Sequence, residues 1–286
     1  MKINEILKHS EKGFSFEFFP PKTEKGRVSL SNTVDLLKKY NPLYVSMTYG
    51  AGGGSQAQTK DAVSMLLDFK DLEVMPHLTC IGSCEKDIKQ MLDGYKSQGI
   101  ENVMALRGDP PMGQSNFNFS TKNYAHASDL VRTLKQYNHF CVGVAVYPEG
   151  HIESKSLDQD MDFTKKKVDA GADFAVTQMF FDNAYYYALL ERMSKKAISL
   201  PVLPGILPLT DVEKVKQFAA ICRTTIPSDI TTKMEKFRHN PVEMEKIGVE
   251  YTIKQCRDLI NNGVKKIHFF TLNKPEIITA IIDAIQ

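Results

Sequence analysis

The sequence has few cysteines, and they show no obvious pairing. Five of the 286 residues are cysteine, at the scattered positions Cys80, Cys84, Cys141, Cys222 and Cys256. An odd, scattered set in a chain of this length is typical of reduced thiols in a cytosolic protein, not of a disulfide framework. No second pair joins Cys80 and Cys84 to complete a zinc site, and no histidines follow an H-x-x-x-H spacing, so we expect no metal.

An excess of charge of one sign and long apolar runs are also missing. Lys and Arg number 36 against 34 Asp and Glu, a net charge of +2, which argues against binding nucleic acid or anionic membranes through bulk charge. No apolar stretch approaches the roughly 18 residues of a membrane helix. The first ten residues lack the uninterrupted apolar segment of a signal peptide. We therefore expect a soluble, cytoplasmic protein.

The composition is otherwise that of a globular protein, 42% hydrophobic and 24% charged. The length allows one or two domains. No linker rich in Pro, Gly or Ser and no low-complexity tract interrupts the chain. We therefore predict a single domain over residues 1–286.

Short β-rich apolar runs alternate with amphipathic stretches. Most successive runs begin about thirty residues apart, the length of one strand–helix unit. The eight predicted strands are residues 14–19, 43–48, 73–79, 102–107, 142–147, 173–178, 201–205 and 266–271. The last gap is longer, and we predict that residues 226–242 form an inserted helical excursion before the final helix and strand of the barrel.

Helix boundaries are visible in several of the intervening stretches. Thr210 and Glu213 match a capping box, with Thr210 as the N-cap. Gly99 and Gly263 follow apolar stripes at helical spacing and are predicted to end their helices.

Eight strand–helix units predict an α/β fold, a (β/α)8 barrel, with a doubly wound open sheet as the alternative. Seven of the eight strands place a polar or aromatic residue at the carboxyl end, where barrel enzymes build their active sites. This pattern favours the barrel. The loop at 50–55 nearly fits the dinucleotide motif G-x-G-x-x-G, but its third Gly is missing, so we interpret it as a flexible strand-to-helix loop.

Glu17 is the first candidate for chemistry. In the first strand Phe14, Phe16 and Phe18 share the face expected to pack on outer helices, so Glu17 is predicted to point into the barrel near its mouth. Desolvation is expected to raise its pKa toward neutrality, as a general acid requires. The alternative is an inward Glu paired with a Lys or Arg.

Three further features could carry chemistry. Asp109 follows Gly108 at a strand end, where it could be an acid or could close an Asx turn. Gln178 could bind the edge of a heterocycle, or it could be a satisfied core amide. The lysines at 165–167 oppose acids at 158, 160 and 162, either as a solvated helix face or as a clamp on a ligand phosphate.

Eight segments, in order from Phe14 to the C-terminus, resemble the bacterial type of methylenetetrahydrofolate reductase. Together they are highly specific, although no single segment is. They are residues 14–22, 45–50, 76–80, 105–109, 168–172, 177–182, 204–208 and 270–273.

The resemblance implies a (β/α)8 barrel with non-covalently bound FAD. It implies reduction of 5,10-methylenetetrahydrofolate to 5-methyltetrahydrofolate with NADH by a ping-pong mechanism, which supplies methyl groups for methionine synthesis. A homo-oligomer, often a tetramer, is also implied. Because the chain stops at Gln286, we expect no C-terminal regulatory domain, no inhibition by S-adenosylmethionine, and NADH in preference to NADPH, although no residue settles the nucleotide.

The resemblance also assigns roles to matching positions. Glu17 corresponds to the general acid that protonates the amine leaving the folate imidazolidine ring, and Asp109 to the acid near flavin and pterin. The substrate-binding positions are Asp109, Gln178, Phe218 and Lys274. The FAD-contact positions are Thr48, Tyr49, Ala51, His77, Arg107, Gly108, Asp109, Ala127, Tyr147, His151, Asp160, Lys166 and Lys167.

Some positions depart from the family pattern. His126 stands where a Tyr is common, with Tyr124 nearby as a substitute, and Phe163 replaces an Asn. The other departures are Phe270 for Tyr, Lys214 for a polar amide, and Lys166 and Lys274 for Arg. Two rival functions are a lyase or aldolase barrel using a Schiff-base Lys, which the lack of a Lys inside an apolar strand disfavours, and a non-catalytic barrel that binds a pterin or nucleotide.

Overall fold

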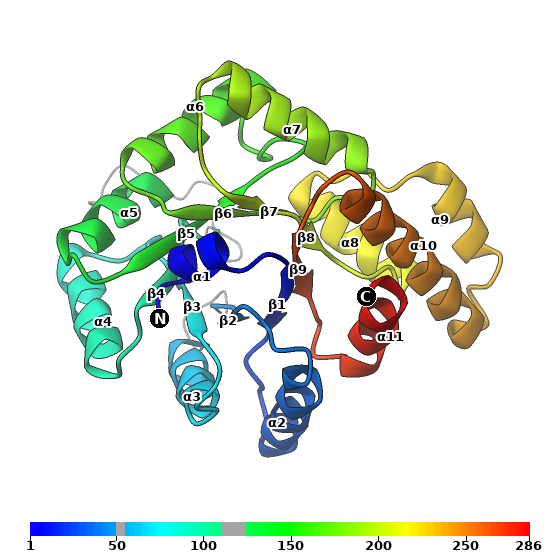
Figure 1. The fold of residues 1–286 in the computed structure, drawn as a ribbon, viewed down its shortest axis with the longest axis horizontal. Helices are drawn as coiled ribbons and strands as arrows, with labels where there is room; N and C mark the ends of the chain where they lie inside the picture. The colour runs from blue at the N-terminus through cyan, green and yellow to red at the C-terminus, as the bar shows by residue number, and fades with distance from the viewer. Residues whose placement is uncertain (50–54, 110–123) are drawn as a thin grey trace.

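Parallel strands form a barrel in the computed structural model, which describes residues 1–49, 55–109 and 124–286 (Figure 1). Neighbouring strands follow the order β7-β6-β5-β4-β3-β2-β1-β9-β8, and all pairs are parallel. The strands are β1 (Gly13–Phe18), β2 (Val45–Met47), β3 (Val74–Thr79), β4 (Asn102–Leu106), β5 (Cys141–Val146), β6 (Phe174–Thr177), β7 (Val202–Leu203), β8 (Gly205–Ile206) and β9 (Lys266–Phe270).

The barrel closes at its seventh strand, which Pro204 divides into β7 and β8. Pro204 has no N–H for a strand ladder, but its carbonyl accepts a hydrogen bond from the His268 N–H at 3.0 Å. β7 pairs with β6, and β8 pairs with β9. Because the two halves are consecutive in the chain, nine short strands fill eight barrel positions. The predicted (β/α)8 barrel is confirmed, and the open-sheet alternative is wrong.

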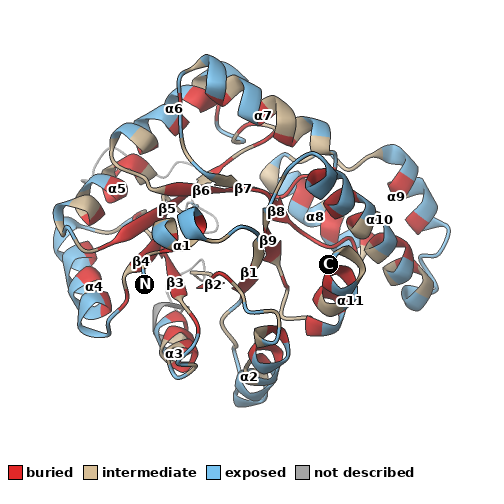
Figure 2. Ribbon diagram, in the orientation of Figure 1, coloured by how far each residue is buried: buried red, intermediate tan, exposed pale blue. Residues whose placement is uncertain are grey.

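The helices other than α1 and α9 form a ring outside the strands, with their buried faces toward the barrel, and α9 packs on α8 and α10 (Figure 2). α9 lies within the predicted excursion. The helices are α1 (Ile3–His9), α2 (Glu24–Lys38), α3 (Ser55–Leu67), α4 (Glu85–Ser97), α5 (Ala127–Gln136), α6 (Leu157–Asp169), α7 (Asn183–Lys195), α8 (Val212–Cys222), α9 (Ser228–Glu235), α10 (Pro241–Asn261) and α11 (Pro275–Ile285).

The helix ends follow local rules, with one correction. Gly99 and Gly263 have φ of +78° and +88° just beyond α4 and α10, as predicted. The N-cap of α8, however, is Asp211 and not Thr210, because Asp211 Oδ1 accepts the N–H groups of Glu213 and Lys214 at 3.1 Å. Thr210 is buried. Thr210 and Asp211 are both residue types that cap helices, and the capping-box motif predicted the wrong one of the two.

The two faces of β1 divide as predicted. Phe16 and Phe18 are fully buried in the layer between strands and helices, where α2 contributes Leu30. Ser15 and Glu17 alternate with them and contact His268 inside the barrel. This alternation follows from the two-residue period of a strand.

α1, which the sequence did not predict, packs across the amino-terminal end of the barrel. Ile3 and Leu7 are buried against interior side chains that include Met75, Met104 and Phe174. Figure 1 shows α1 in the middle of the ring of strands. This end of the barrel is therefore filled with apolar side chains.

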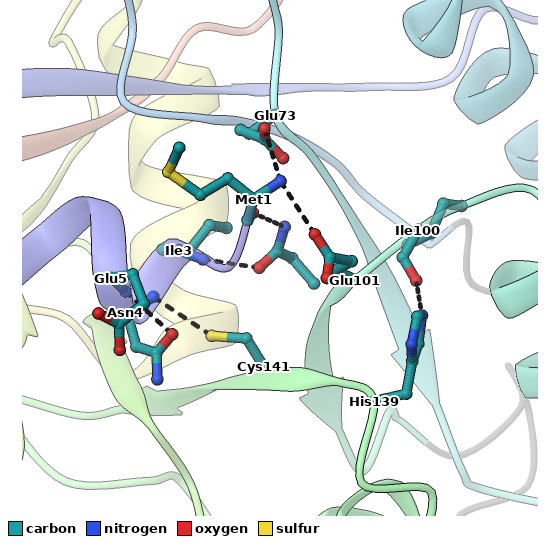
Figure 3. A network of polar contacts seen from close by, with 10 residues as sticks. Met1, Ile3, Asn4, Glu5, Glu73, Ile100, Glu101, His139 and Cys141 are labelled. Atoms are coloured by element: carbon teal, nitrogen blue, oxygen red, sulfur yellow. Dashed lines mark hydrogen bonds and ion pairs between the residues drawn. The ribbon is translucent and has the colours of Figure 1, made fainter.

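Polar contacts hold α1 to the beginnings of the strands (Figure 3). The Ile3 N–H donates to Asn102 Oδ1 at 2.8 Å, and the Asn4 N–H donates to Cys141 Sγ at 3.4 Å. The Met1 amine lies 2.7 Å from a Glu73 carboxylate oxygen and 3.0 Å from one of Glu101. A ligand therefore has to enter from the opposite, carboxyl-terminal end.

Among residues 1–49, 55–109 and 124–286, no helix is both long enough and apolar enough to cross a bilayer.

Candidate active site

Two cavities open at the carboxyl ends of the strands and share one wall. The central cavity, of about 410 Å³, is lined by residues of β1, β3, β4, β5, β6 and β9, by the segments that follow several strands, and by α8. The lateral cavity, of about 200 Å³, lies beside β4 and β5 against α5 and α6. The shared wall consists of Leu106, Arg107, Ala145, Tyr147 and His151.

Glu17 lies in the central cavity between two histidines. Its Oε2 is 3.4 Å from His268 Nε2 in a hydrogen bond, and 3.3 Å from His77 Nε2 without hydrogen-bond alignment. The register of β1 against β9 pairs Ser15 with His268, and the Ser15 hydroxyl contacts His268 Nδ1 at 2.8 Å. Strands far apart in the sequence thus place a carboxylate and two imidazoles in one buried cluster.

The pKa of Glu17 corrects the sequence-based expectation. Burial, the largest single influence, raises it, but the close, charged His77 and the hydrogen bond from His268 together outweigh burial and lower the pKa to about 2. Glu17 is therefore ionised near neutral pH. The alternative expectation, that Glu17 pairs with a Lys or Arg, is also wrong, because the side chains that face this carboxylate are histidines.

The segment after β4 forms part of the shared wall. Gly108 has φ of +88°, and an added Cβ would lie 2.7 Å from Ile81 Cγ2 and 2.9 Å from Thr79 Cβ, so only Gly fits. Gly108 places Asp109, which is exposed, on the lining of the central cavity. The Asx-turn alternative for Asp109 involves Pro110 and Pro111, which lie outside the described residues.

The lateral cavity is lined by one acidic and one basic side chain of α6, Asp160 and Lys167. Asp160 Oδ1 accepts the His151 N–H and the Ser154 hydroxyl, both at 3.0 Å, whereas its buried Oδ2 has no hydrogen-bond partner within the described part of the chain. Lys167 is buried and donates to the Ala145 carbonyl at 2.6 Å. Burial lowers the pKa of Lys167 to about 8, against the opposing charge of Asp160.

His151 presents one defined nitrogen. Its Nδ1 accepts the Glu153 N–H at 3.2 Å, so in the neutral ring the proton is on Nε2. Burial and, after it, the charge of Arg107 lower the pKa of His151 and favour this neutral form.

The lysines at 165–167 on α6 were predicted to form either a solvated face or a phosphate clamp, and different members of the run support each alternative. Lys165 pairs with Asp169 at 2.8 Å on the solvated face of the helix. Lys196, the C-cap residue of α7, and not the run itself, binds Asp158 and Asp162, at 2.7 and 2.8 Å. Only Lys167 lines the cavity, so only it supports the phosphate clamp.

Two of the departures from the family pattern lie at the lateral cavity, and a third, Phe270, lines the central one. The rings of His126 and Phe163 both line it, with centroids 5.3 Å apart. Lys166 is exposed, and its Nζ lies 5.1 Å above the Phe163 ring. Tyr124 does not substitute for His126, because it is buried with its hydroxyl 3.0 Å from Thr133 Oγ1.

Most predicted site residues meet in the two cavities. Gln178 is half-buried in the central wall and its Oε1 accepts the Met179 N–H at 2.8 Å, so it is not a core amide. The predicted residues that line one or both cavities are Glu17, His77, Arg107, Gly108, Asp109, Ala127, Tyr147, His151, Asp160, Lys167, Gln178 and Phe218.

Four predicted residues do not line either cavity. Thr48 and Tyr49 follow β2, Lys166 lies outside on α6, and Lys274 occupies the N-cap position of α11. Ala51, with the rest of its glycine-rich loop, lies outside the described residues.

Several lining or contacting residues were not predicted. His268 could have been found from its strand pattern, since it alternates with apolar residues and its side chain points inward with Ser15. Ile152, Glu153 and Ile221 carry no local signal, because they reach the cavities through a loop and a helix turn. Within the described ranges, no group of three His, Cys, Asp or Glu side chains could hold a metal ion.

The chain matches a known family over nearly its whole length. The family model described as methylenetetrahydrofolate reductase covers residues 2–286. The chain is 37% identical over 267 residues to the 5,10-methylenetetrahydrofolate reductase of Escherichia coli (strain K12). The aligned residues cover 93% of this chain and 88% of that protein.

A plant relative and a solved structure extend the comparison. The chain is 36% identical to methylenetetrahydrofolate reductase (NADH) 1 of Arabidopsis thaliana over 95% of its own length, but it spans only 48% of that protein. A solved protein from Clostridium thermocellum, described as uncharacterized and as binding two copies of 5-methyl-5,6,7,8-tetrahydrofolic acid, superposes with a TM-score of 0.63. It is 15% identical over 98% of this chain and 96% of that one, and so shares the fold.

Proposed function

This chain belongs to the methylenetetrahydrofolate reductase family, and from that premise we propose that it reduces 5,10-methylenetetrahydrofolate to 5-methyltetrahydrofolate with NADH and bound FAD in a ping-pong cycle. One observation carries the proposal: a cavity with the buried cluster of Glu17, His77 and His268 joins a cationic cavity through a common wall. The first cavity can carry out proton chemistry on a substrate, and the second can hold the phosphates of a dinucleotide cofactor.

The lateral cavity fits the diphosphate and nucleoside part of FAD. Arg107, His151 and Lys167 line it and provide positive charge or N–H donors. The unpartnered Asp160 Oδ2 is an acceptor that suits a ribose hydroxyl. FAD would supply the transfer of two electrons from NADH to the folate.

The central cavity supports pterin binding beside the flavin. Gln178 offers an amide for the edge of the heterocycle, and Asp109 faces the same space. Phe218, Ile152 and Ile221 are exposed large apolar residues on its lining, which suits the aminobenzoyl ring. The solved protein from Clostridium thermocellum, described as binding 5-methyl-5,6,7,8-tetrahydrofolic acid, agrees with this choice of ligand.

Glu17 would act on the folate as a charged group within a proton-sharing cluster. Its carboxylate stabilises the cationic iminium formed when the imidazolidine ring opens. The proton for the departing amine passes through the cluster, since His77 and His268 nitrogens lie within 3.4 Å of Oε2 and an imidazole nitrogen can donate or accept a proton. Glu17 thus remains the residue proposed to deliver the proton, although it is not a carboxylic acid at rest.

The same cavity would serve NADH and folate in turn. Glu17, Asp109 and Gln178 all line the central cavity of about 410 Å³. The product would supply methyl groups for methionine synthesis. The homo-oligomer and the cytoplasmic location stay predictions.

An absorption experiment tests the proposal. The purified protein, loaded with FAD if necessary, is expected to show flavin bands that bleach when NADH is added without oxygen and return when 5,10-methylenetetrahydrofolate follows. Repeating the titration with NADPH measures the nucleotide preference. A protein that fails to take up FAD would contradict the reductase function, and bands that bleach but do not return would contradict folate as the acceptor.

A further inference from the structure

Arg107 in the wall between the cavities is held by one carboxylate. Its Nη1 and Nη2 donate to the two oxygens of Glu153 at 2.5 and 2.6 Å, and its Nε donates to the Gly108 carbonyl at 3.2 Å. A bidentate pair of this kind fixes both the position and the plane of a guanidinium. The side chain of Arg107 is 16% exposed and that of Glu153 is 47% exposed.

Glu153 is itself set in a loop of defined geometry between β5 and α6. Its N–H donates to His151 Nδ1 at 3.2 Å, and the Ser154 N–H donates to the His151 carbonyl at 2.9 Å. The Ser154 hydroxyl donates to Asp160 on α6 at 3.0 Å. The carboxylate that holds Arg107 is therefore anchored through this loop to the same Asp160 that lines the lateral cavity.

A dinucleotide spanning both cavities has to cross the wall that Arg107 lines. In the proposed placement the diphosphate of FAD lies in the lateral cavity beside this wall, where the charge and the remaining N–H donors of the Arg107 guanidinium can reach it. A long, partly exposed Arg side chain without a partner populates many rotamers. Both Nη atoms at the outer edge of the fork donate to Glu153, so the orientation of the guanidinium is expected to loosen when that carboxylate is removed.

We propose that Glu153 is a positioning residue for cofactor binding, which holds the Arg107 guanidinium in the wall so that it meets the diphosphate of the bound dinucleotide. The proposal rests on the proposed FAD site. Glu153 acts through Arg107 and need not touch the cofactor.

A double-mutant cycle tests the coupling. Apoprotein is titrated with FAD, and binding is followed by flavin fluorescence in four proteins: unchanged, Glu153→Ala, Arg107→Ala, and both together. Glu153→Ala is expected to weaken FAD binding about tenfold, and to have almost no further effect once Arg107 is absent. Glu153→Gln, which retains one acceptor for the fork, is expected to lie between the unchanged protein and Glu153→Ala.

Glu149→Ala is the matched control. Glu149 lies in the same loop and accepts the Thr225 N–H at 3.0 Å, but it lines neither cavity, so FAD affinity is expected to stay within twofold. The proposal would be overturned if Glu153→Ala lowered the FAD affinity equally with and without Arg107. It would also be overturned if Glu153→Ala tightened FAD binding, because Glu153 would then compete with the diphosphate for Arg107. No uptake of FAD by the unchanged protein would instead contradict the proposed function.

Discussion

At the scale of single residues, the chemistry depends on charges that only the folded protein brings together. Glu17 comes from β1, His77 from β3 and His268 from β9. Burial by itself raises the pKa of a carboxyl group, and two nearby imidazoles reverse that direction. The residue is therefore better described as one member of a buried cluster than as an isolated acid.

Glu17→Gln separates the two half-reactions. The amide keeps the size of the side chain but can neither carry charge nor pass a proton, so FAD binding and NADH oxidation are expected to persist while folate reduction falls at least about a hundredfold. Stopped-flow absorption at the flavin bands measures each half-reaction. If folate reoxidised the flavin of the variant at the normal rate, Glu17 would have no part in the proton transfer.

Asp109→Asn tests the electrostatics of the central wall. Removing a negative charge near the flavin favours its reduced form, so the flavin potential is expected to rise by about 20 mV, the equivalent of about 1 kcal/mol for two electrons. Potentiometric titration of the flavin gives this value. An unchanged potential would show that Asp109 does not lie near the flavin.

At the scale of elements, close backbone approach decides which glycines are needed. Gly248 lies within α10, and a Cβ added there would come 1.3 Å from the Leu209 carbonyl oxygen, so the helix or the segment after β8 has to move. Gly94 lies within α4, where an added Cβ meets nothing within 4 Å. The same substitution should therefore have opposite effects in the two helices.

Gly248→Ala is expected to lower the free energy of unfolding by about 3 kcal/mol or more, because the overlap cannot be relieved by a side-chain rotation. Gly94→Ala, the matched control, is expected to raise it by about 0.5 to 1 kcal/mol through helix propensity. Urea unfolding followed by circular dichroism measures both. Equal effects of the two substitutions would mean that α10 does not pack this closely on Leu209.

At the scale of the whole molecule, the Glu17 cluster ties stability to pH. The carboxyl has a pKa of about 2 in the folded protein against 4.5 for the free group, so its contribution is complete above pH 4.5 and is lost as the pH falls toward 2. The difference corresponds to about 3 kcal/mol. The advantage of the unchanged protein over Glu17→Gln in unfolding free energy is expected to shrink by about that amount between pH 5 and pH 2.

Urea unfolding of both proteins at several pH values measures this advantage. An advantage that instead changes between pH 5 and pH 7 would show that burial dominates and that Glu17 is protonated in the folded state, as the sequence alone suggested.

The barrel was predictable from the sequence because its causes are local. Apolar runs, the two-residue alternation of β1 and glycines such as Gly99 and Gly263 act within a few residues. α1 was not predictable, since its seven residues are stabilised by contacts with strands that begin 70 to 140 positions later.

The sequence by itself determined the succession of strands and helices, the end of the barrel that carries polar groups, and twelve of the residues that line the two cavities. Only the tertiary structure decided which groups face one another. It sets Glu17 against two histidines and so lowers its pKa, it turns Lys167 inward while Lys165 stays in solvent, and it joins Arg107 to Glu153 across 46 positions. Electrostatic interactions depend on distance in space and on burial, and neither is set by spacing along the chain.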